Sequence, residues 1–290
     1  MNKKITLLCP AKINLSLDVT GKRPDNYHTL DSIFQTVSVY DTLEITLADG
    51  EGISLECDNP AVPCDESNLA YKAVKAFLHY AGIQAKISIR LEKHIPSGAG
   101  MGGGSADAAG VLYALNLLTE KNYSNPELRE IGVNLGADVP FLLLGGTARA
   151  QGIGEVLTSL RPLPEIPLVI LKGTESISTP EAYKAIDSLL SPVHPDTSAM
   201  LKAVQNQDVE LLCQNCANLF EAVTECQDVS RAEKVLLEHG AQCAVMTGSG
   251  AAVFGIFKDS MTAKACAENL RHDFAFVQAC HMTKQAFQVI

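Results

Sequence analysis

The segment KHIPSGAGMGGGSADAA, residues Lys93–Ala109, decides how this chain is interpreted. Five of the seven residues from Gly98 to Gly104 are glycines, which leave backbone N–H groups unshielded and permit positive φ angles. The loop leads into a predicted helix that begins at Ser105, where unpaired N–H groups and the helix dipole favour an anion. A flexible turn capped by Ser105 is the alternative, but a turn needs one or two glycines. The segment therefore predicts a phosphate-binding loop.

Two other phosphate motifs fit these residues less well. Gly98, Gly100 and Gly103 match the G-x-G-x-x-G spacing of dinucleotide-binding folds, but no strand that ends in an acidic residue follows at the required distance. A Walker A loop is excluded, because the glycine run does not end in Gly-Lys-Ser or Gly-Lys-Thr.

Apolar patterns before the loop predict strands, a turn and a helix. Apolar residues alternate in the β manner within residues 13–17, 43–47, 53–55 and 86–91. Asp49-Gly50 is a hairpin-type turn signal between two of these runs. Ser67 or Asn68 is suited to cap a helix that runs to about Tyr80 and stops at Gly82.

Beyond the loop the patterns are mostly helical. The helix that follows the loop has apolar residues on one face, from Ala108 to Leu118. The later elements are expected to be a helix from Pro126 to about Gly136, strands at Phe141–Leu144 and Leu168–Leu171, a helix at Val209–Val223, a strand–turn–strand at Ala244–Phe257 and a helix from Ser260. Because strands and helices do not alternate strictly, the pattern favours the α+β class. Three prolines in Leu160–Pro167 predict a boundary between domains 1–160 and 161–290.

Composition narrows the function classes. The chain has 290 residues, of which 47% are apolar, and a formal net charge of −10, which argues against a nucleic-acid partner. No apolar stretch is long enough for a membrane helix, and the N-terminus lacks the pattern of a signal peptide, so we expect a cytoplasmic protein without a membrane partner. The nine cysteines are interpreted as structural, and Cys213-Gln214-Asn215-Cys216 matches no metal or redox template. No metal-ligand set is expected from the chain itself, and its assembly is left open between monomer and homodimer.

Three motifs resemble those of the GHMP kinases, which include galactokinase, homoserine kinase and mevalonate kinase. They are PAKINL at Pro10–Leu15, the glycine segment from Pro96, and MTGSGAAVFG at Met246–Gly255, and they occur in the order expected for that superfamily. The resemblance implies an N-terminal domain like ribosomal protein S5, a ferredoxin-like C-terminal domain and ATP as phosphate donor. It implies that the third motif closes over the phosphates through Thr247, Gly248, Ser249 and Gly250. The ATP-binding residues that it implies are Pro96, Ser97, Gly98, Ala99, Gly100, Met101, Gly102, Gly103, Gly104, Ser105 and Ala106.

Three further segments resemble one branch of this superfamily, the kinases that act on cytidine-diphosphate-linked methylerythritol. These segments are Lys12–Leu15, Gly21–Leu30 and Leu135–Phe141. The resemblance implies a small-molecule substrate, phosphorylated on its 2-hydroxyl with Mg²⁺ and ATP, in the non-mevalonate route to isoprenoid precursors. Many members have a second serine where this chain has Ala106; if that hydroxyl helps to hold Mg²⁺, water must replace it here.

Lys12 and Asp138 each have two interpretations from the residues alone. Asp138 precedes Pro140 on a constrained turn, where its carboxylate either caps the turn or accepts a proton. Lys12 lies on an otherwise apolar strand, where it either reaches solvent, which is favoured, or balances a negative group. The resemblance implies that Asp138 is the catalytic base and that Lys12 lies beside it and stabilises developing charge.

The acceptor site is implied by the same resemblance. Asn14 shares a strand face with Lys12 and would bond the methylerythritol hydroxyls. Tyr27 would stack on the cytosine, His28 would bond its polar edge, and Tyr183 would be a second aromatic on the far side of the base. From sequence alone, an equally good interpretation of Tyr27-His28 is a core tyrosine next to a surface histidine, with no role in binding.

The sequence alone leaves two alternatives to a kinase of cytidine-diphosphate-linked methylerythritol. A homoserine or mevalonate kinase is disfavoured by the Tyr27-His28 turn and by the motif Gly136–Pro140. A non-catalytic nucleotide-binding protein would be expected to lose Lys12 or Asp138, and both are present.

Overall fold

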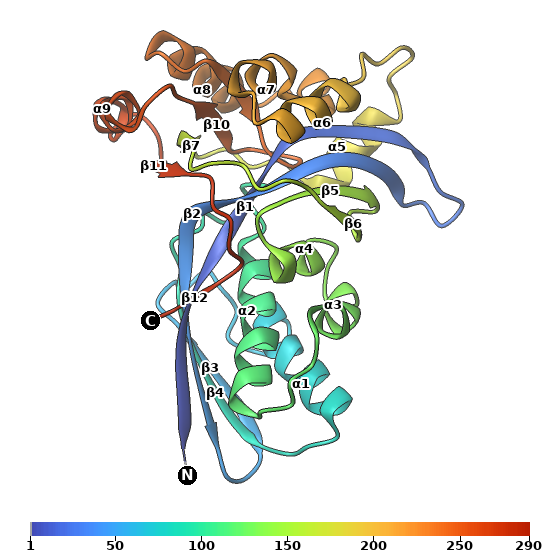
Figure 1. The fold of residues 1–290 in the computed structure, drawn as a ribbon, viewed down its shortest axis with the longest axis vertical. Helices are drawn as coiled ribbons and strands as arrows, with labels where there is room; N and C mark the ends of the chain where they lie inside the picture. The colour runs from blue at the N-terminus through green and yellow to red at the C-terminus, as the bar shows by residue number, and fades with distance from the viewer. Residues whose placement is uncertain (1) are drawn as a thin grey trace.

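A long antiparallel hairpin forms the centre of the first sheet (Figure 1). The computed structural model describes residues 2–290, and the hairpin consists of β1 (Lys3–Lys22) and β2 (His28–Ala48). Both strands combine the β-type alternations that the sequence shows in shorter runs. The sheet has the order β12-β1-β2-β4-β3, with β3 at Gly52–Cys57, β4 at Lys86–Glu92 and β12 at Gln288–Val289. Three shorter strands extend the sheet: β5 (Thr147–Gly152) pairs with β2, β6 (Val156–Ser159) pairs with β5, and β8 (Ala217–Asn218) pairs with β1.

The Asp49-Gly50 turn does not close a hairpin of paired strands, so this prediction was wrong. The chain does reverse there, between β2 and β3. However, β4 lies between those two strands: it pairs antiparallel with β2, placing Leu91 opposite Leu43, and parallel with β3. A turn sequence sets the local reversal, whereas the neighbour of a strand is chosen by the buried face that it completes.

Helices α1 (Leu69–Ala81), α2 (Gly103–Leu118) and α4 (Val139–Leu144) pack on the first sheet, and α3 (Asn125–Val133) packs against these helices (Figure 1). The ends of α1 are as expected, since the Asn68 side chain accepts from Ala70 N and Gly82 has a left-handed φ of 61°. Helix α2 begins at Gly103, two residues before the predicted start at Ser105, with Gly102 as its N-cap. The glycine loop therefore contributes its last two glycines to the helix N-terminus.

Residues 141–144 form the end of α4 and not the expected strand. The run is apolar without interruption and too short for its period to separate a strand from a buried helix. Pro140 lies in the first helical turn, where the missing N–H costs no hydrogen bond, and residues 139–143 are buried. Gly145, with a φ of 71°, ends the helix.

The second sheet has the order β11-β7-β10-β9, with strands at Phe276–His281, Pro167–Lys172, Val253–Ile256 and Cys243–Met246. Helices α8 (Gln227–Glu238) and α9 (Ser260–Leu270) pack on it, and α5 (Thr179–Ile186), α6 (Thr197–Asn206) and α7 (Val209–Asn215) complete the upper part of Figure 1. The α+β class is confirmed. The helix expected to reach Val223 ends at Asn215, and a 3-10 turn, Leu219–Ala222, follows β8.

The long hairpin connects the two sheets. Leu17, Val19 and Leu30, from its far end, pack into the hydrophobic cluster of the second sheet. In the other direction, β12 near the C-terminus returns to pair with β1. The domain boundary between residues 160 and 161 stays a prediction. The elements on either side of it are connected by the packing of the hairpin end and by the pairing of β12 with β1.

All nine cysteines are free thiols. A hydrogen bond with Cys243 and burial raise the pKa of the Cys213 thiol, which therefore stays protonated. Within residues 2–290 no cluster of three acidic, histidine or cysteine side chains is arranged to hold a metal ion. None of the helices formed by those residues is long and apolar enough to span a membrane.

Candidate active site

The glycine loop lines a cavity of about 340 Å³ in front of the N-terminus of α2. Gly98, Gly100 and Gly102 have φ angles of 61°, 73° and 72°, which residues with a side chain rarely adopt. The helix dipole and the free N–H groups of its first turn point toward this space, which suits a chain of phosphates. Residues 96–104 of the expected ATP loop line this cavity together, whereas Ser105 lines a neighbouring cavity and Ala106 is buried.

The third glycine motif lies against this loop. Ala251 N donates to Gly98 O and Ala252 N donates to Ala99 O, both at 3.3 Å. Gly100 approaches the Thr247 carbonyl so closely that a Cβ at this position would overlap it. Of the four residues expected to close over the phosphates, Thr247 and Gly248 contact Gly100 directly, whereas the Ser249 hydroxyl lies 2.8 Å from Thr179 Oγ1.

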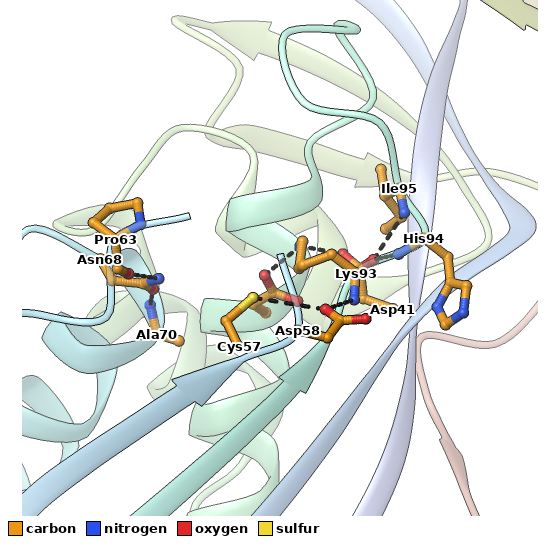
Figure 2. Close-up of polar contacts among 10 residues, drawn as sticks. Asp41, Cys57, Asp58, Pro63, Asn68, Ala70, Lys93, His94 and Ile95 are labelled. Carbon is orange, nitrogen blue, oxygen red and sulfur yellow. Dashed lines mark hydrogen bonds and ion pairs between the residues drawn. The ribbon is translucent and has the colours of Figure 1, made fainter. Parts of the chain in front are cut away.

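A buried charge cluster supports the loop from below (Figure 2). The Lys93 ammonium donates to Asp41 of β2 and, at 2.5 Å, to Asp107 of α2. The other oxygen of Asp41 accepts the backbone N–H groups of His94, at 2.6 Å, and Ile95, at 2.8 Å. The cluster therefore fixes both the chain that enters the loop and the helix that leaves it.

Asp107 is the strained member of this cluster. Burial raises the pKa of its carboxyl to about 7, against the effect of the nearby Lys93 ammonium, which lowers it. Its Oδ1 atom is buried and has no hydrogen-bond partner within residues 2–290. Lys93 received no role from its sequence context. Asp107, although it lies in the quoted segment Lys93–Ala109, was also given none, and Asp41 lies outside every motif.

The wall opposite the loop is built at the start of α1. The Asn68 side chain donates to Pro63 O at 2.7 Å and caps Ala70 N at 2.8 Å (Figure 2). Asp58 accepts the backbone N–H of Lys93 at 2.9 Å, which ties the end of β3 to the end of β4. Val62, Asn68 and Leu69 face the same cavity as the glycines.

Lys12 and Asp138 meet in a second cavity of about 290 Å³. The Lys12 Nζ lies 3.7 Å from Asp138 Oδ2 and 5.0 Å from the centre of the Phe34 ring. The lysine side chain is only 5% exposed, so it does not reach out to solvent as the isolated pattern favoured. Asp138 occupies the N-cap position of α4, yet its side chain makes no capping hydrogen bond. Its carboxylate is left to face Lys12 and the cavity.

Asn14 connects this centre to the third glycine motif. Its Oδ1 accepts from Lys12 Nζ at 2.9 Å, from Thr247 Oγ1 at 3.2 Å and from Gly248 N at 3.0 Å. Its Nδ2 donates to Ser32 Oγ at 2.9 Å, and the residue is 2% exposed. The geometry thus adds a structural task, holding Lys12 and the turn together, to the acceptor contact expected from sequence.

Asn218 is a second support of that turn, and the sequence analysis missed it. Its Nδ2 donates to the carbonyls of Met246, at 2.7 Å, and Gly248, at 2.8 Å. It lies just after α7, within the range Val209–Val223 for which the sequence predicted one continuous helix. No local signal marks it, because its partners lie about 30 residues away.

A third cavity, of about 520 Å³, lies between the β1–β2 turn and α5 and contains the expected base-binding residues. Tyr27, 60% exposed, lines it together with His28 and Tyr183. The rings of His28 and Tyr183 are stacked, with centres 4.7 Å apart and planes inclined by 18°. Burial, and then the negative charge of Asp138, raise the pKa of the Tyr183 hydroxyl to about 12, so it stays a neutral donor.

The three cavities form one series. The first and second share Gly100 and Gly102, while the second and third share Ala137, Ile153, Thr179 and Tyr183. Lys12 and Asp138 thus lie between a space suited to phosphates and a space suited to an aromatic base.

Comparison with known proteins shows the family to which this chain belongs. The family model described as "GHMP kinases N terminal domain" matches residues 68–146, and the model described as "GHMP kinases C terminal" matches residues 200–275. The 4-diphosphocytidyl-2-C-methyl-D-erythritol kinase of Clostridium botulinum strain Alaska E43 is 41% identical over 269 residues, covering 92% of this chain and 96% of that protein. The enzyme of the same name from Clostridium tetani is 41% identical over 266 residues, covering 91% and 95%. The chain belongs to this kinase family.

Solved structures agree with this family assignment. A crystal structure of 4-(cytidine 5′-diphospho)-2C-methyl-D-erythritol kinase has 33% identity and a TM-score of 0.83, covering 98% of this chain and all of that one. A homoserine kinase from Cytophaga hutchinsonii has 19% identity and a TM-score of 0.80, over 99% and 97% of the two chains, which shows the shared fold alone. The two-domain GHMP kinase fold, and the resemblance read from the motifs, are confirmed.

The glycine contact in this kinase gives a first prediction. Gly100→Ala should weaken ATP binding about 5- to 30-fold or more, because a left-handed φ costs a side chain about 1–2 kcal/mol and the Cβ would also displace the Thr247 carbonyl. Gly98→Ala is the matched control, since its φ is also positive but its Cβ would meet nothing closer than Ser176 at 3.9 Å. Calorimetric titration with ATP compares them. Equal losses in both variants would mean that the contact with the third motif contributes nothing to nucleotide binding.

Proposed function

We propose that the protein transfers the γ-phosphoryl group of ATP to the 2-hydroxyl of 4-(cytidine 5′-diphospho)-2-C-methyl-D-erythritol, a step in the non-mevalonate supply of isoprenoid precursors. The observation that carries this proposal is the series of cavities, with Lys12 and Asp138 between the glycine loop and the aromatic cavity. The names of the relatives that share the family support the choice of substrate.

Asp138 and Lys12 are assigned to the reacting hydroxyl. The carboxylate, which accepts no capping hydrogen bond, takes the hydroxyl proton or orients the hydroxyl for attack on the γ-phosphorus. The Lys12 ammonium, 3.7 Å away and held by Asn14, stabilises the negative charge that develops on the transferred oxygens. Asn14, which lines the same cavity, is assigned to the methylerythritol hydroxyls, the role expected from sequence.

The triphosphate is assigned to the glycine loop and the N-terminus of α2. Magnesium suits this site as an ion carried by phosphates and water, since the described chain provides no acidic cage for it. Ser105, which lines the cavity of Asp138, has the side-chain oxygen that would contact the ion, whereas Ala106 is buried and offers none. When bound, the ion neutralises phosphate charge.

A panel assay tests the proposed function. Purified protein, ATP and Mg²⁺ are combined separately with the cytidine-diphosphate-linked methylerythritol, homoserine and mevalonate, and ADP release is followed. We expect turnover with the cytidine substrate only. Comparable turnover of homoserine or mevalonate would refute the substrate assignment and leave the kinase family standing.

The assignment of Tyr27 gives a second prediction. Tyr27→Ala should raise KM for the cytidine substrate about 5- to 150-fold and leave kcat nearly unchanged, because base stacking is worth about 1–3 kcal/mol and acts equally in ground and transition states. Tyr27→Phe keeps the ring and should resemble the unmodified protein. Steady-state kinetics at varied acceptor and ATP concentrations decide it. A fall in kcat at constant KM would place Tyr27 at the reacting centre.

A further inference from the structure

Asp187, which no sequence motif marks, holds one edge of the His28 ring. The residue follows the last turn of α5 and lies opposite the end of β1. Its Oδ1 lies 2.7 Å from His28 Nε2, and its Oδ2 accepts from Lys22 Nζ at 2.5 Å. The hydrogen bond with His28, followed by the one with Lys22, lowers the pKa of the Asp187 carboxyl. Asp187 is therefore an ionised acceptor at neutral pH.

The plane of the His28 ring is fixed by the same helix. Tyr183 stacks on the imidazole, and it stands four positions before Asp187, on the same face of the helix. Only 8% of the His28 side chain is exposed. Stacking thus sets the plane of the ring, and the carboxylate sets its rotation within that plane.

This arrangement determines which ring nitrogen carries the hydrogen. An ionised carboxylate only accepts hydrogen bonds, so in the neutral imidazole Nε2 holds the hydrogen and Nδ1 presents a lone pair. Within residues 2–290, Nδ1 has no hydrogen-bond partner, and it is not among the buried polar atoms that lack one. Since His28 lines the cavity between Tyr27 and Tyr183, Nδ1 is available to a ligand as an acceptor.

We propose that Asp187 is a positioning residue for pyrimidine specificity: it keeps His28 Nδ1 a hydrogen-bond acceptor, which selects the 4-amino group of cytosine over the 4-oxo group of uracil. This inference rests on the proposed function, in which a cytosine base occupies the cavity. A cytosine amino group donates to the Nδ1 lone pair, whereas a uracil oxygen would set lone pair against lone pair. Leaving such acceptors unpaired costs about 1–3 kcal/mol, which corresponds to a preference of about 5- to 150-fold.

The test measures binding of CDP and UDP to the full chain by calorimetry. The unmodified protein should prefer CDP about 5- to 150-fold. In Asp187→Asn the new amide can donate to Nε2, which allows the hydrogen to move to Nδ1, so the preference should disappear or reverse. Asp187→Ala should reduce the preference without reversing it. Lys184→Ala is the matched control: it removes a charge from the wall of the same cavity but leaves the hydrogen bond between Asp187 and His28 in place, and it should weaken both ligands equally.

A spectroscopic readout separates this role from simple support of the fold. Nitrogen-15 chemical shifts of the His28 ring, read without ligand, should report hydrogen on Nε2 in the unmodified protein and on Nδ1 in Asp187→Asn. An unchanged CDP-to-UDP ratio or an unchanged tautomer in folded Asp187→Asn would overturn the inference while the proposed function stands. If the proposed function itself is wrong, the result is different: CDP does not bind, and the panel assay shows no turnover of the cytidine substrate. That outcome would remove both the proposed function and this inference.

Discussion

Asp138→Asn should lower kcat for the cytidine substrate about 10²- to 10⁴-fold, the usual contribution of a general base. The amide cannot accept the hydroxyl proton, although it fills the same volume. The fold should tolerate the change, since the Asp138 side chain makes no capping hydrogen bond to α4 and lies 3.7 Å from its ionic partner. ATP affinity should be retained, because the carboxylate lines the central cavity and not the one in front of the glycine loop.

Single-turnover kinetics and calorimetry test this result together. Asp208→Asn is the matched control: Asp208 does cap its helix, by accepting Leu211 N at 3.0 Å, and asparagine caps equally well, so turnover should not change. Loss of ATP binding in Asp138→Asn, with chemistry intact once ATP is bound, would make Asp138 a structural or metal-binding residue instead of the base.

Lys93→Ala should destabilise the protein by about 3–5 kcal/mol, the usual cost of removing one partner from a buried ion pair. The Asp41 side chain is 0% exposed and that of Asp107 is 4% exposed, so neither carboxylate can be solvated when the ammonium is gone. Lys93→Met retains most of the aliphatic stem and should lose a similar amount of stability. A similar loss would show that the missing charge, and not the missing packing, destabilises the protein. Urea unfolding gives the values.

The loss in Lys93→Ala should grow as pH rises. In the folded protein the pKa of Asp107 is raised to about 7, so the folded state binds a proton that the unfolded chain releases near pH 4. The stability that goes with this protonation is complete below about pH 4 and is lost as pH rises through about 7. Lys93 lowers the pKa of Asp107, so without this lysine the buried Asp107 carboxyl depends still more on protonation. Unfolding at pH 5.5 and at pH 8 measures the difference, and equal losses at both would contradict this account of the cluster.

Much of the site followed from local sequence. The glycines at 98, 100 and 102 permit a left-handed backbone without steric cost, and all three have positive φ angles. Asn68 and Gly82 mark the ends of α1 because capping depends on a few adjacent atoms. Lys12, Asp138 and the third glycine motif were found through their resemblance to a family, and the comparisons support that family.

Only the tertiary structure shows which residues, distant in the sequence, contact one another in the site. Lys93 bonds to Asp41, 52 positions away in the sequence, and to Asp107, 14 positions away. These ion pairs are buried, and a buried charge without a partner is costly, so the pairing is required. Asp187 reaches His28 across 159 positions, and Asn14 reaches Gly248 across 234. The strand expected at 141–144 became a helix, and β4 separated β2 from β3, because the buried faces available to these segments were set by the rest of the chain. Local sequence encodes backbone preference and the chemistry of each side chain; which charge meets which partner depends on packing between distant segments.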